Sequence, residues 1–169
     1  MKYYADINDG SYLGSWDDAD PNRPTGHTEL TTAPEHGDQT WDGTAWKCSK
    51  QTLKDYCAHY RWVKETSGIA TTTTPLYLVD TSDRSKVLLN GAYNKVLAAS
   101  NPNATMEFKT GTGWQSITYS NIEQIALDVA DHTSKCFTAE ENVGILIDND
   151  TIADRAGVES QFDTEYAAL

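Results

Sequence analysis

Positive charge is scarce in this sequence. Its 169 residues include 13 Lys and Arg against 25 Asp and Glu, which gives a formal net charge of −12 at pH 7. Nucleic acids and anionic membrane surfaces are bound through clustered Lys and Arg. The composition therefore predicts that neither a nucleic acid nor a membrane is a partner of this protein.

Long apolar runs are also missing. No stretch approaches the roughly 20 consecutive apolar residues of a membrane-spanning helix, and the opening residues MKYYADINDG lack the apolar segment of a signal peptide. We therefore expect a soluble protein that is made without classical export. The length fits one domain, or one compact domain with an appendage.

Cysteines and catalytic motifs are sparse as well. Cys48, Cys57 and Cys136 form no C-x-x-C pair, which favours reduced, buried thiols over a disulfide framework or a zinc site. His132 and Cys136 have the spacing of two metal ligands on one helix face, but no second pair follows, and apolar neighbours favour core packing. The sequence has no G-x-S-x-G, P-loop, G-x-G-x-x-G or H-E-x-x-H motif. We expect no enzyme activity, no cofactor and no bound metal.

Two other segments have some features of a cation site. Asp148-Asn149-Asp150 begins like a calcium loop, but Ala153 stands where the loop needs glycine. A solvated acidic turn or a helix cap is the expected structure there. His27 and His36 lie among carboxylates in a proline-rich stretch, whose irregular chain fixes no ligand geometry.

The charge divides the chain into three parts. Residues 1–48 contain nine acidic and three basic residues, 49–137 contain eight and nine, and 138–169 contain eight and one. We interpret these parts as an aromatic, acidic N-terminal arm (1–48), an α+β body (49–137) and an acidic C-terminal helical segment (138–169). Such asymmetry bears on the choice of partner rather than on the fold.

The arm has the signals of two hairpins and a loop. Aromatic-rich runs on both sides of Asn8-Asp9-Gly10 predict a β-hairpin over residues 2–17. Residues 18–39 contain three of the five prolines and no apolar periodicity, which predicts an extended loop without a core. Residues 41–46 predict a second small hairpin with a tryptophan at each end.

Helical periodicity and capping signals predict the helices of the body. One helix runs from Ser49 to about Thr66, one begins at Thr81 or Ser82 and stops at Asn101-Pro102, and one follows a capping box at Ser120–Glu123. A further helix is expected from Thr151. The predicted apolar stripes of the second and third helices include Leu88, Leu89, Ala92, Val96 and Ala99, and then Ile122, Ile125, Ala126, Val129, Ala130, Thr133, Cys136 and Phe137.

Short strands complete the predicted body. The runs IATTTT and LYLVD, separated at Pro75, predict two strands, and TMEFKT followed by GTG and WQSIT predicts a hairpin. The expected fold class is α+β, with three to four helices and short antiparallel strands, preceded by a hairpin and loop-rich arm.

Six aromatic residues lie in the arm, where little core can form. They must pack on the rest of the chain or become buried against a partner, and both alternatives stay open at this point. The candidate partner-binding residues are Tyr3, Tyr4, Tyr12, Trp16, Trp41 and Trp46.

Several short motifs follow one another between about Tyr60 and Phe137. They are Tyr60-Arg61 with Glu65, Gly68-Ile69, Asp83-Arg84-Ser85, LNGAY at 89–93, NPNAT at 101–105, FKT at 108–110, Gly113-Trp114 and the segment IEQIALDVADHTSKCF. In this order they resemble a small uncharacterised domain at the C-terminal side of tailed-bacteriophage tail-fibre and fibre-accessory proteins. The element WDGTAW at 41–46 looks like the W-D-G-x-x-W element that often precedes this domain. The MKYY start is similar to that of small tail-fibre assembly proteins.

The resemblance implies that the protein is located in the phage tail. It provides no catalytic residues, because none are established for that domain. It leads us to expect a non-enzymatic structural protein of the virion, assembled in the host cytoplasm and bound to tail-fibre or baseplate protein through the arm. The alternative is a tail-fibre assembly chaperone that caps the fibre tip. A third hypothesis is a small metal-dependent enzyme or a carbohydrate binder that uses acidic side chains and exposed tryptophans. The oligomeric state, including a homotrimer, stays open.

Overall fold

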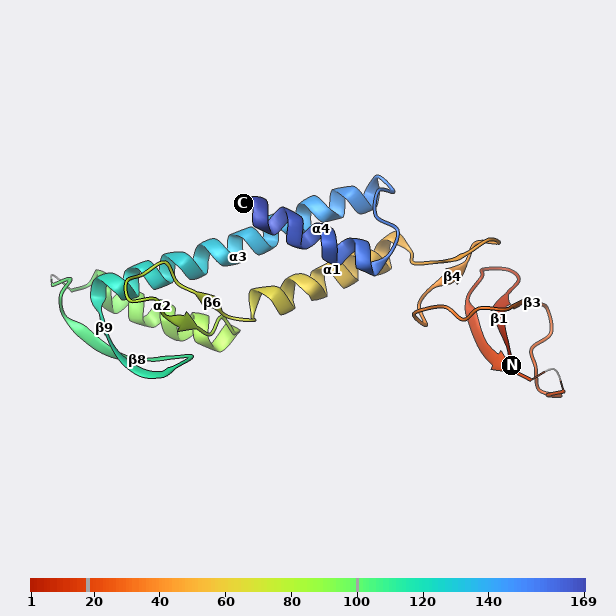
Figure 1. The fold of residues 1–169 in the computed structure, drawn as a ribbon, viewed down its shortest axis with the longest axis horizontal. Helices are drawn as coiled ribbons and strands as arrows, with labels where there is room; N and C mark the ends of the chain where they lie inside the picture. Colours follow the sequence, from red (N-terminus) through yellow and green to blue (C-terminus); the bar gives the residue numbers. More distant parts are fainter. Residues whose placement is uncertain (18, 100) are drawn as a thin grey trace. The chain divides into compact units, whose positions relative to one another are not determined.

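The computed structural model describes residues 1–17, 19–99 and 101–169. Asp18 and Ser100 lie outside the described residues. Asp18 is the first residue of the predicted loop, and Ser100 directly precedes the predicted helix end at Asn101-Pro102. Helices and short antiparallel strand pairs confirm the predicted α+β class (Figure 1). The helices are α1 (Lys50–Glu65), α2 (Asp83–Leu97), α3 (Tyr119–Asp148) and α4 (Arg155–Ala168).

The strands form four small antiparallel sheets in the described residues. The strands of the first 57 residues are β1 (Lys2–Asp6), β2 (Tyr12–Trp16), β3 (His27–Leu30), β4 (Thr40–Trp41) and β5 (Trp46–Lys47). The later strands are β6 (Ile69–Ala70), β7 (Leu78–Val79), β8 (Thr105–Thr110) and β9 (Gly113–Thr118). Both arm hairpins and the β8–β9 hairpin confirm the turn-based predictions.

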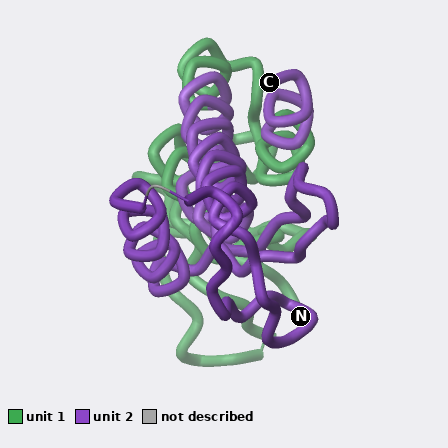
Figure 2. The backbone as a smooth tube through the Cα atoms, turned by 90° about the vertical axis from the view of Figure 1, so that its left-hand side faces the viewer, with its two compact units in different colours: residues 1–57, 144–161 green, residues 58–143, 162–169 purple. Residues whose placement is uncertain are grey.

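The described chain divides into two compact units, which Figure 2 shows in different colours. Unit 1 consists of residues 1–57 and 144–161, and unit 2 consists of 58–143 and 162–169. The predicted boundary at 137/138 falls inside α3, which continues to Asp148 because the apolar spacing continues. Ala139, Val143 and Ile147 are fully buried along this part of α3.

The prediction of an extended loop over 18–39 is wrong at β3, where the chain forms a strand. This strand pairs with β1, with Tyr3 opposite Leu30 and Asp6 opposite His27, and gives a sheet of order β2-β1-β3. Leu30 is buried at 8% exposure. The segment has too few apolar residues to show a strand period, so its pairing depends on the neighbouring strand rather than on its own pattern.

Gly10 gives a direct test of the first hairpin. Its φ is +72°, and a Cβ atom there would lie 2.2 Å from the carbonyl oxygen of Trp41. Gly26 has nearly the same φ, +71°, but open space around it. We expect Gly26→Ala to cost about 1 to 2 kcal/mol and Gly10→Ala about 3 kcal/mol or more, measured by amide hydrogen exchange in β1 and β2. Equal losses in the two variants would contradict the close contact at Gly10.

The core of unit 2 lies between α2, α3 and the β8–β9 hairpin. Its buried apolar residues are Tyr77, Val79, Leu89, Val96, Ile117, Tyr119, Ile122, Ile125 and Val129. The predicted stripes are wider than this core. Leu88, Ala130 and Phe137 are exposed, because each helix turns only a narrow face inward. Ala99, also exposed, lies beyond the end of α2.

The helix starts follow the predicted capping chemistry in two of three places. The Oγ of Ser49 accepts a hydrogen bond from the Thr52 N–H at 3.0 Å, and that of Ser82 accepts one from Ser85 at 3.4 Å. The predicted capping residue of the third helix, Ser120, is two residues too late. The Thr118 Oγ1 accepts from the Asn121 N–H at 3.3 Å, so α3 begins at Tyr119. The end of strand β9 thus caps the helix that follows it. Helix α2 ends at Leu97, before the predicted stop.

Candidate partner-binding surfaces

Tyr4 is the centre of the arm sheet. Its side chain is fully buried, and its ring meets those of Trp16 and His27 edge to face, with centroids 5.6 Å and 4.5 Å away. The three residues come from the three neighbouring strands β1, β2 and β3. This aromatic group therefore provides the small core that holds the sheet together.

Trp46 is the centre of a second aromatic group. Its ring lies 5.6 Å from Tyr12 and 5.6 Å from Trp41, both edge to face, and its Nε1–H donates to the Thr32 carbonyl at 3.0 Å. The backbone N–H of Trp41 donates to the Gly10 carbonyl at 2.8 Å. The second hairpin is thereby joined to the turn of the first.

The turn of the second hairpin is fixed by Asp42. Its carboxylate accepts hydrogen bonds from the backbone N–H groups of Thr44 and Ala45, both at 2.8 Å, and pairs with the Lys47 ammonium at 2.6 Å. The hydrogen bond from Lys47, together with those from Ala45 and Thr44, lowers the pKa of the Asp42 carboxyl. The W-D-G-x-x-W element is therefore explained by local turn chemistry.

The structure brings five of the six candidate aromatic residues into these two groups. Tyr3, the sixth, is half-buried in β1 opposite Ser15 and Leu30. The residues pack on one another within the arm, and all except Tyr4 keep part of their surface exposed. The binding role predicted for them remains a prediction.

Trp46→Phe is expected to destabilise the second hairpin by about 1 kcal/mol. The variant keeps an aromatic ring against Tyr12 and Trp41 but loses the hydrogen bond to Thr32. Hydrogen exchange at the amides of β4 and β5 measures this loss. Trp114→Phe, at a tryptophan that is 70% exposed, is the matched control and should leave those amides unchanged. A loss of the same size in the control would contradict the assignment.

Arg155 holds the arm to α4 within unit 1. Its guanidinium pairs with Asp38 at 2.5 Å and lies 4.8 Å from the centroid of the Tyr56 ring. Burial is the main cause that raises the pKa of the nearby Cys48 thiol, and the Asp38 carboxylate adds to it. The thiol is therefore protonated near neutral pH.

The acidic turn after α3 is paired with lysines of α1 in the same unit. Lys50 Nζ donates to the Asp148 carbonyl at 2.7 Å and pairs with Asp150 at 2.8 Å, while Lys54 pairs with Asp148 at 2.7 Å. Asp150 has φ +58° at the end of the helix. These contacts agree with the expected helix cap.

Large apolar side chains that are strongly exposed are concentrated in unit 2. In the described chain they are Trp62, Val63, Leu76, Leu78, Val87, Leu88, Leu97, Trp114, Leu127, Phe137 and Leu169, against Met1, Ile7 and Ile145 in unit 1. The sequence interpretation assigned Leu88 and Phe137 to buried faces. The exposure of Trp114 could have been predicted from strand alternation in WQSI, which places Trp114 on the face opposite Ile117.

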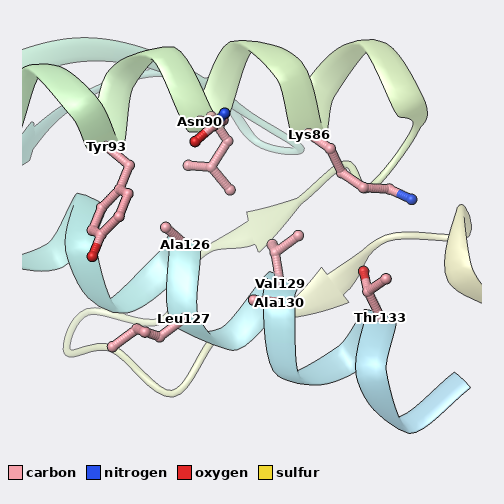
Figure 3. A pocket seen from close by; sticks show the side chains of 9 residues that line it. Lys86, Asn90, Tyr93, Ala126, Leu127, Val129, Ala130 and Thr133 are labelled. Atoms are coloured by element: carbon pink, nitrogen blue, oxygen red, sulfur yellow. The ribbon is translucent and has the colours of Figure 1, made fainter. Parts of the chain in front are cut away.

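One apolar groove lies between α2 and α3. Its volume is about 440 Å³, and Figure 3 shows Tyr93, Asn90 and Lys86 on the α2 side facing Ala126 and Thr133 of α3. The ammonium of Lys86 is already paired with the carboxylates of Glu65 and Asp83. The groove therefore offers an apolar surface rather than a free positive charge.

An ionic network around the buried carboxylate of Glu65 lies beside this groove. Glu65 is 6% exposed and pairs with both Lys86 and Arg61, while Arg61 Nε donates to Glu140 at 2.9 Å. The Arg61 guanidinium also lies 4.4 Å from the centroid of the Phe137 ring. Burial acts to raise the pKa of the Glu65 carboxyl, but the hydrogen bonds from Lys86 and Arg61 outweigh burial and lower it. This carboxylate is therefore ionised and fully engaged in ion pairs.

His132 and Cys136 lie in the core of unit 2. His132 Nδ1 is 2.6 Å from the Tyr166 hydroxyl, and Cys136 Sγ is 3.9 Å from His132 Nε2. Burial raises the pKa of Cys136 to about 11, so its thiol is protonated at neutral pH. Burial also raises the pKa of Tyr166. No group of three or more His, Cys, Asp or Glu residues in the described chain is arranged to hold a metal ion.

Comparison with known proteins places most of the chain in one family. The sequence profile of a domain of unknown function, DUF4376, matches residues 48–159, about two thirds of the chain. No curated protein matches the chain, and no solved structure does. Among the described residues, no helix has both the length and the apolar character that crossing a membrane requires. The matched range contains α1 to α3, both short sheets between them and the first residues of α4, and the chain therefore belongs to the DUF4376 family.

Proposed function

We propose that the protein is a non-enzymatic structural component of a bacteriophage tail. In this proposal it is located in the virion, is assembled in the host cytoplasm, and binds tail-fibre or baseplate protein through its N-terminal arm. The motifs between Tyr60 and Phe137 and the element at 41–46 support the phage assignment by resemblance.

The way the arm folds on its own residues supports a binding role for it. Residues 1–47 precede the family match, and they build their own sheet and aromatic groups around Tyr4 and Trp46. Five partly exposed aromatic side chains on a small, preformed β structure offer rigid contact area at little cost in conformational entropy. Such a structure suits binding to another protein.

Quantitative mass spectrometry of purified tail particles tests the resident role. A fixed number of copies per tail, such as a multiple of three or six, supports it. Tyr3→Ser in the full chain should reduce incorporation at least about tenfold, since it removes a half-buried contact residue without opening either aromatic group. Leu127→Ser, at an exposed residue of α3, is the control and should be incorporated normally.

The alternative function gives the opposite result in the same measurement. Absence of the chain from mature particles, together with abundance in producing cells, would contradict a resident part and favour a fibre assembly chaperone. In that case the fibre expressed alone should be insoluble or misassembled and should be rescued by co-expression of this chain.

A further inference from the structure

A second groove lies on the other side of α2. Its volume is about 340 Å³, and residues of α2 and of the β8–β9 hairpin line it. Both elements belong to unit 2, and Figure 1 labels them. Leu88 and Ala92 line it from the helix, residues 106–109 line it from β8, and Trp114 lines it from β9. It shares no lining residue with the groove between α2 and α3.

Strand β8 presents an unpaired edge to this groove. Successive side chains of a strand point to opposite faces, so a groove lined by four consecutive residues meets the strand at its edge. In the described chain β9 is the only strand paired with β8 in a sheet. The N–H of Gly111, just after β8, donates to the Leu78 carbonyl of β7 at 2.7 Å, so the open part of the edge is within residues 105–109. The hairpin turn has two residues, which makes Thr110 and Gly113 a hydrogen-bonded pair. By alternation, the backbone N–H and C=O groups of Glu107 and Lys109 point away from β9.

The groove also has exposed apolar contact points. Trp114 is 70% exposed and Leu88 is 59% exposed, while Phe108, which also lines the groove, is half-buried. Tryptophan is enriched among the residues that contribute most to protein interfaces. Exposed apolar groups beside a free strand edge match the mode in which a peptide adds a strand to a sheet.

The charge of the chain and of the groove lining indicates which kind of protein segment the groove binds. A second copy would bring another net charge of −12, which opposes self-association. Asp80 and Glu107 line the groove against a single base, Lys109. The hydrogen bond from the Ser85 hydroxyl and that from the Ser82 N–H lower the pKa of the Asp80 carboxyl, so this negative charge persists in mildly acidic solution.

We propose that this groove binds an extended segment of a different, basic protein, which adds to β8 as a third strand. The apolar side chains of that segment face Leu88 of α2, and the Lys or Arg side chains between them face Glu107 on the opposite side of the hairpin, where Trp114 also lies. This surface is independent of the arm, and its test does not involve phage particles.

A blocked hexapeptide of alternating Lys and Val, titrated into the ¹⁵N-labelled full chain, is the first probe. We expect saturable amide shifts centred on residues 105–110 and on the Trp114 indole, weakened at least about tenfold between low and physiological salt. The same peptide with Glu in place of Lys should not bind. No shifts with the basic peptide at millimolar concentration, or shifts centred on the α2–α3 groove, would overturn the proposal.

Two variants, Lys109→Pro and Lys109→Ala, distinguish the contribution of the backbone N–H at the strand edge from that of the side-chain charge. Both remove the ammonium, but only proline removes the outward N–H, and an edge strand tolerates proline at such a position. The alanine variant should bind the Lys-Val peptide at least as well as the parent, and the proline variant at least about tenfold more weakly. Equal binding by the two variants would contradict strand addition.

A second measurement covers the case in which the proline variant does not fold. The Lys-Val peptide methylated on alternate backbone nitrogens should lose binding to the unmodified chain by a similar factor, and retained binding would contradict strand addition. Sedimentation of the chain without peptide tests the other occupant. Self-association that is lost in Leu88→Ser and Trp114→Ser would show that a second copy occupies the groove and would overturn the proposal.

Discussion

Replacing Glu65 with Gln is expected to lower the free energy of unfolding by about 3 kcal/mol. Glu65 is the shared partner of Lys86 and Arg61 and is itself buried. Removing one member of a buried ionic network leaves the others without their counter-charge in a poorly solvated place. Arg61 keeps Glu140, and Lys86 keeps a longer pair with Asp83, which places the loss at the lower end of the usual range.

The same variant should change the pH dependence of stability. The folded pKa of Glu65 lies below its ordinary value of 4.5, so its contribution is complete above that value and is lost as the pH falls through the folded pKa. Glu65→Gln should therefore lose less stability than the parent between about pH 5 and pH 3. Chemical denaturation at several pH values measures both effects.

An exposed ion pair provides the control for this prediction. Asp131 and Lys135 are 3.5 Å apart on α3, and the Asp131 side chain is 69% exposed. Asp131→Asn should cost at most about 0.5 kcal/mol. A loss at Glu65 no larger than the loss at Asp131 would show that burial adds nothing to the network.

Phe162→Ala is expected to destabilise the chain by about 4 kcal/mol. Phe162 lies in α4, is fully buried, and meets the Tyr60 ring of α1 edge to face at 5.3 Å, within unit 2. Truncation removes a large apolar side chain and leaves a cavity, which together cost about 3 to 5 kcal/mol. Denaturant unfolding followed by far-UV circular dichroism measures the loss.

Phe137→Ala is the matched control within the same unit. Phe137 is 50% exposed, and its contact is the Arg61 guanidinium above its ring. Its loss should be about 1 kcal/mol. If the two alanine variants were equally destabilised, α4 would not be packed on α1 as the structure describes.

Local chemistry explains which elements the sequence alone could predict. Helices α1 and α2 begin directly after Ser49 and Ser82, because these side chains accept hydrogen bonds from backbone N–H groups of the first turn, and that signal is present in a few adjacent residues. The hairpins follow from turn residues in the same way. Strand β3 depends on pairing with β1, which lies more than twenty residues away, so no local pattern predicts it.

The candidate surfaces were only partly predictable for the same reason. The six aromatic residues of the arm are visible in the sequence, but the contact of Tyr12 with Trp46 joins positions 34 residues apart. The exposure of Leu88 depends on how far α2 turns its apolar face inward. The groove beside β8 needs the helix and the hairpin to be placed together, and no spacing along the chain contains that information.

Three helices have residues in both units, and this limits the positions at which related genes could be joined without interrupting a helix. Helices α1, α3 and α4 each contribute residues to both units, so a recombination joint between the units would have to interrupt all three. A joint between Lys47 and Cys48 interrupts none and keeps the Ser49 cap with its helix. The family match begins at that position. A joint there leaves every helix intact but separates Asp38 from Arg155, so an exchanged arm would have to bring its own partner for that guanidinium.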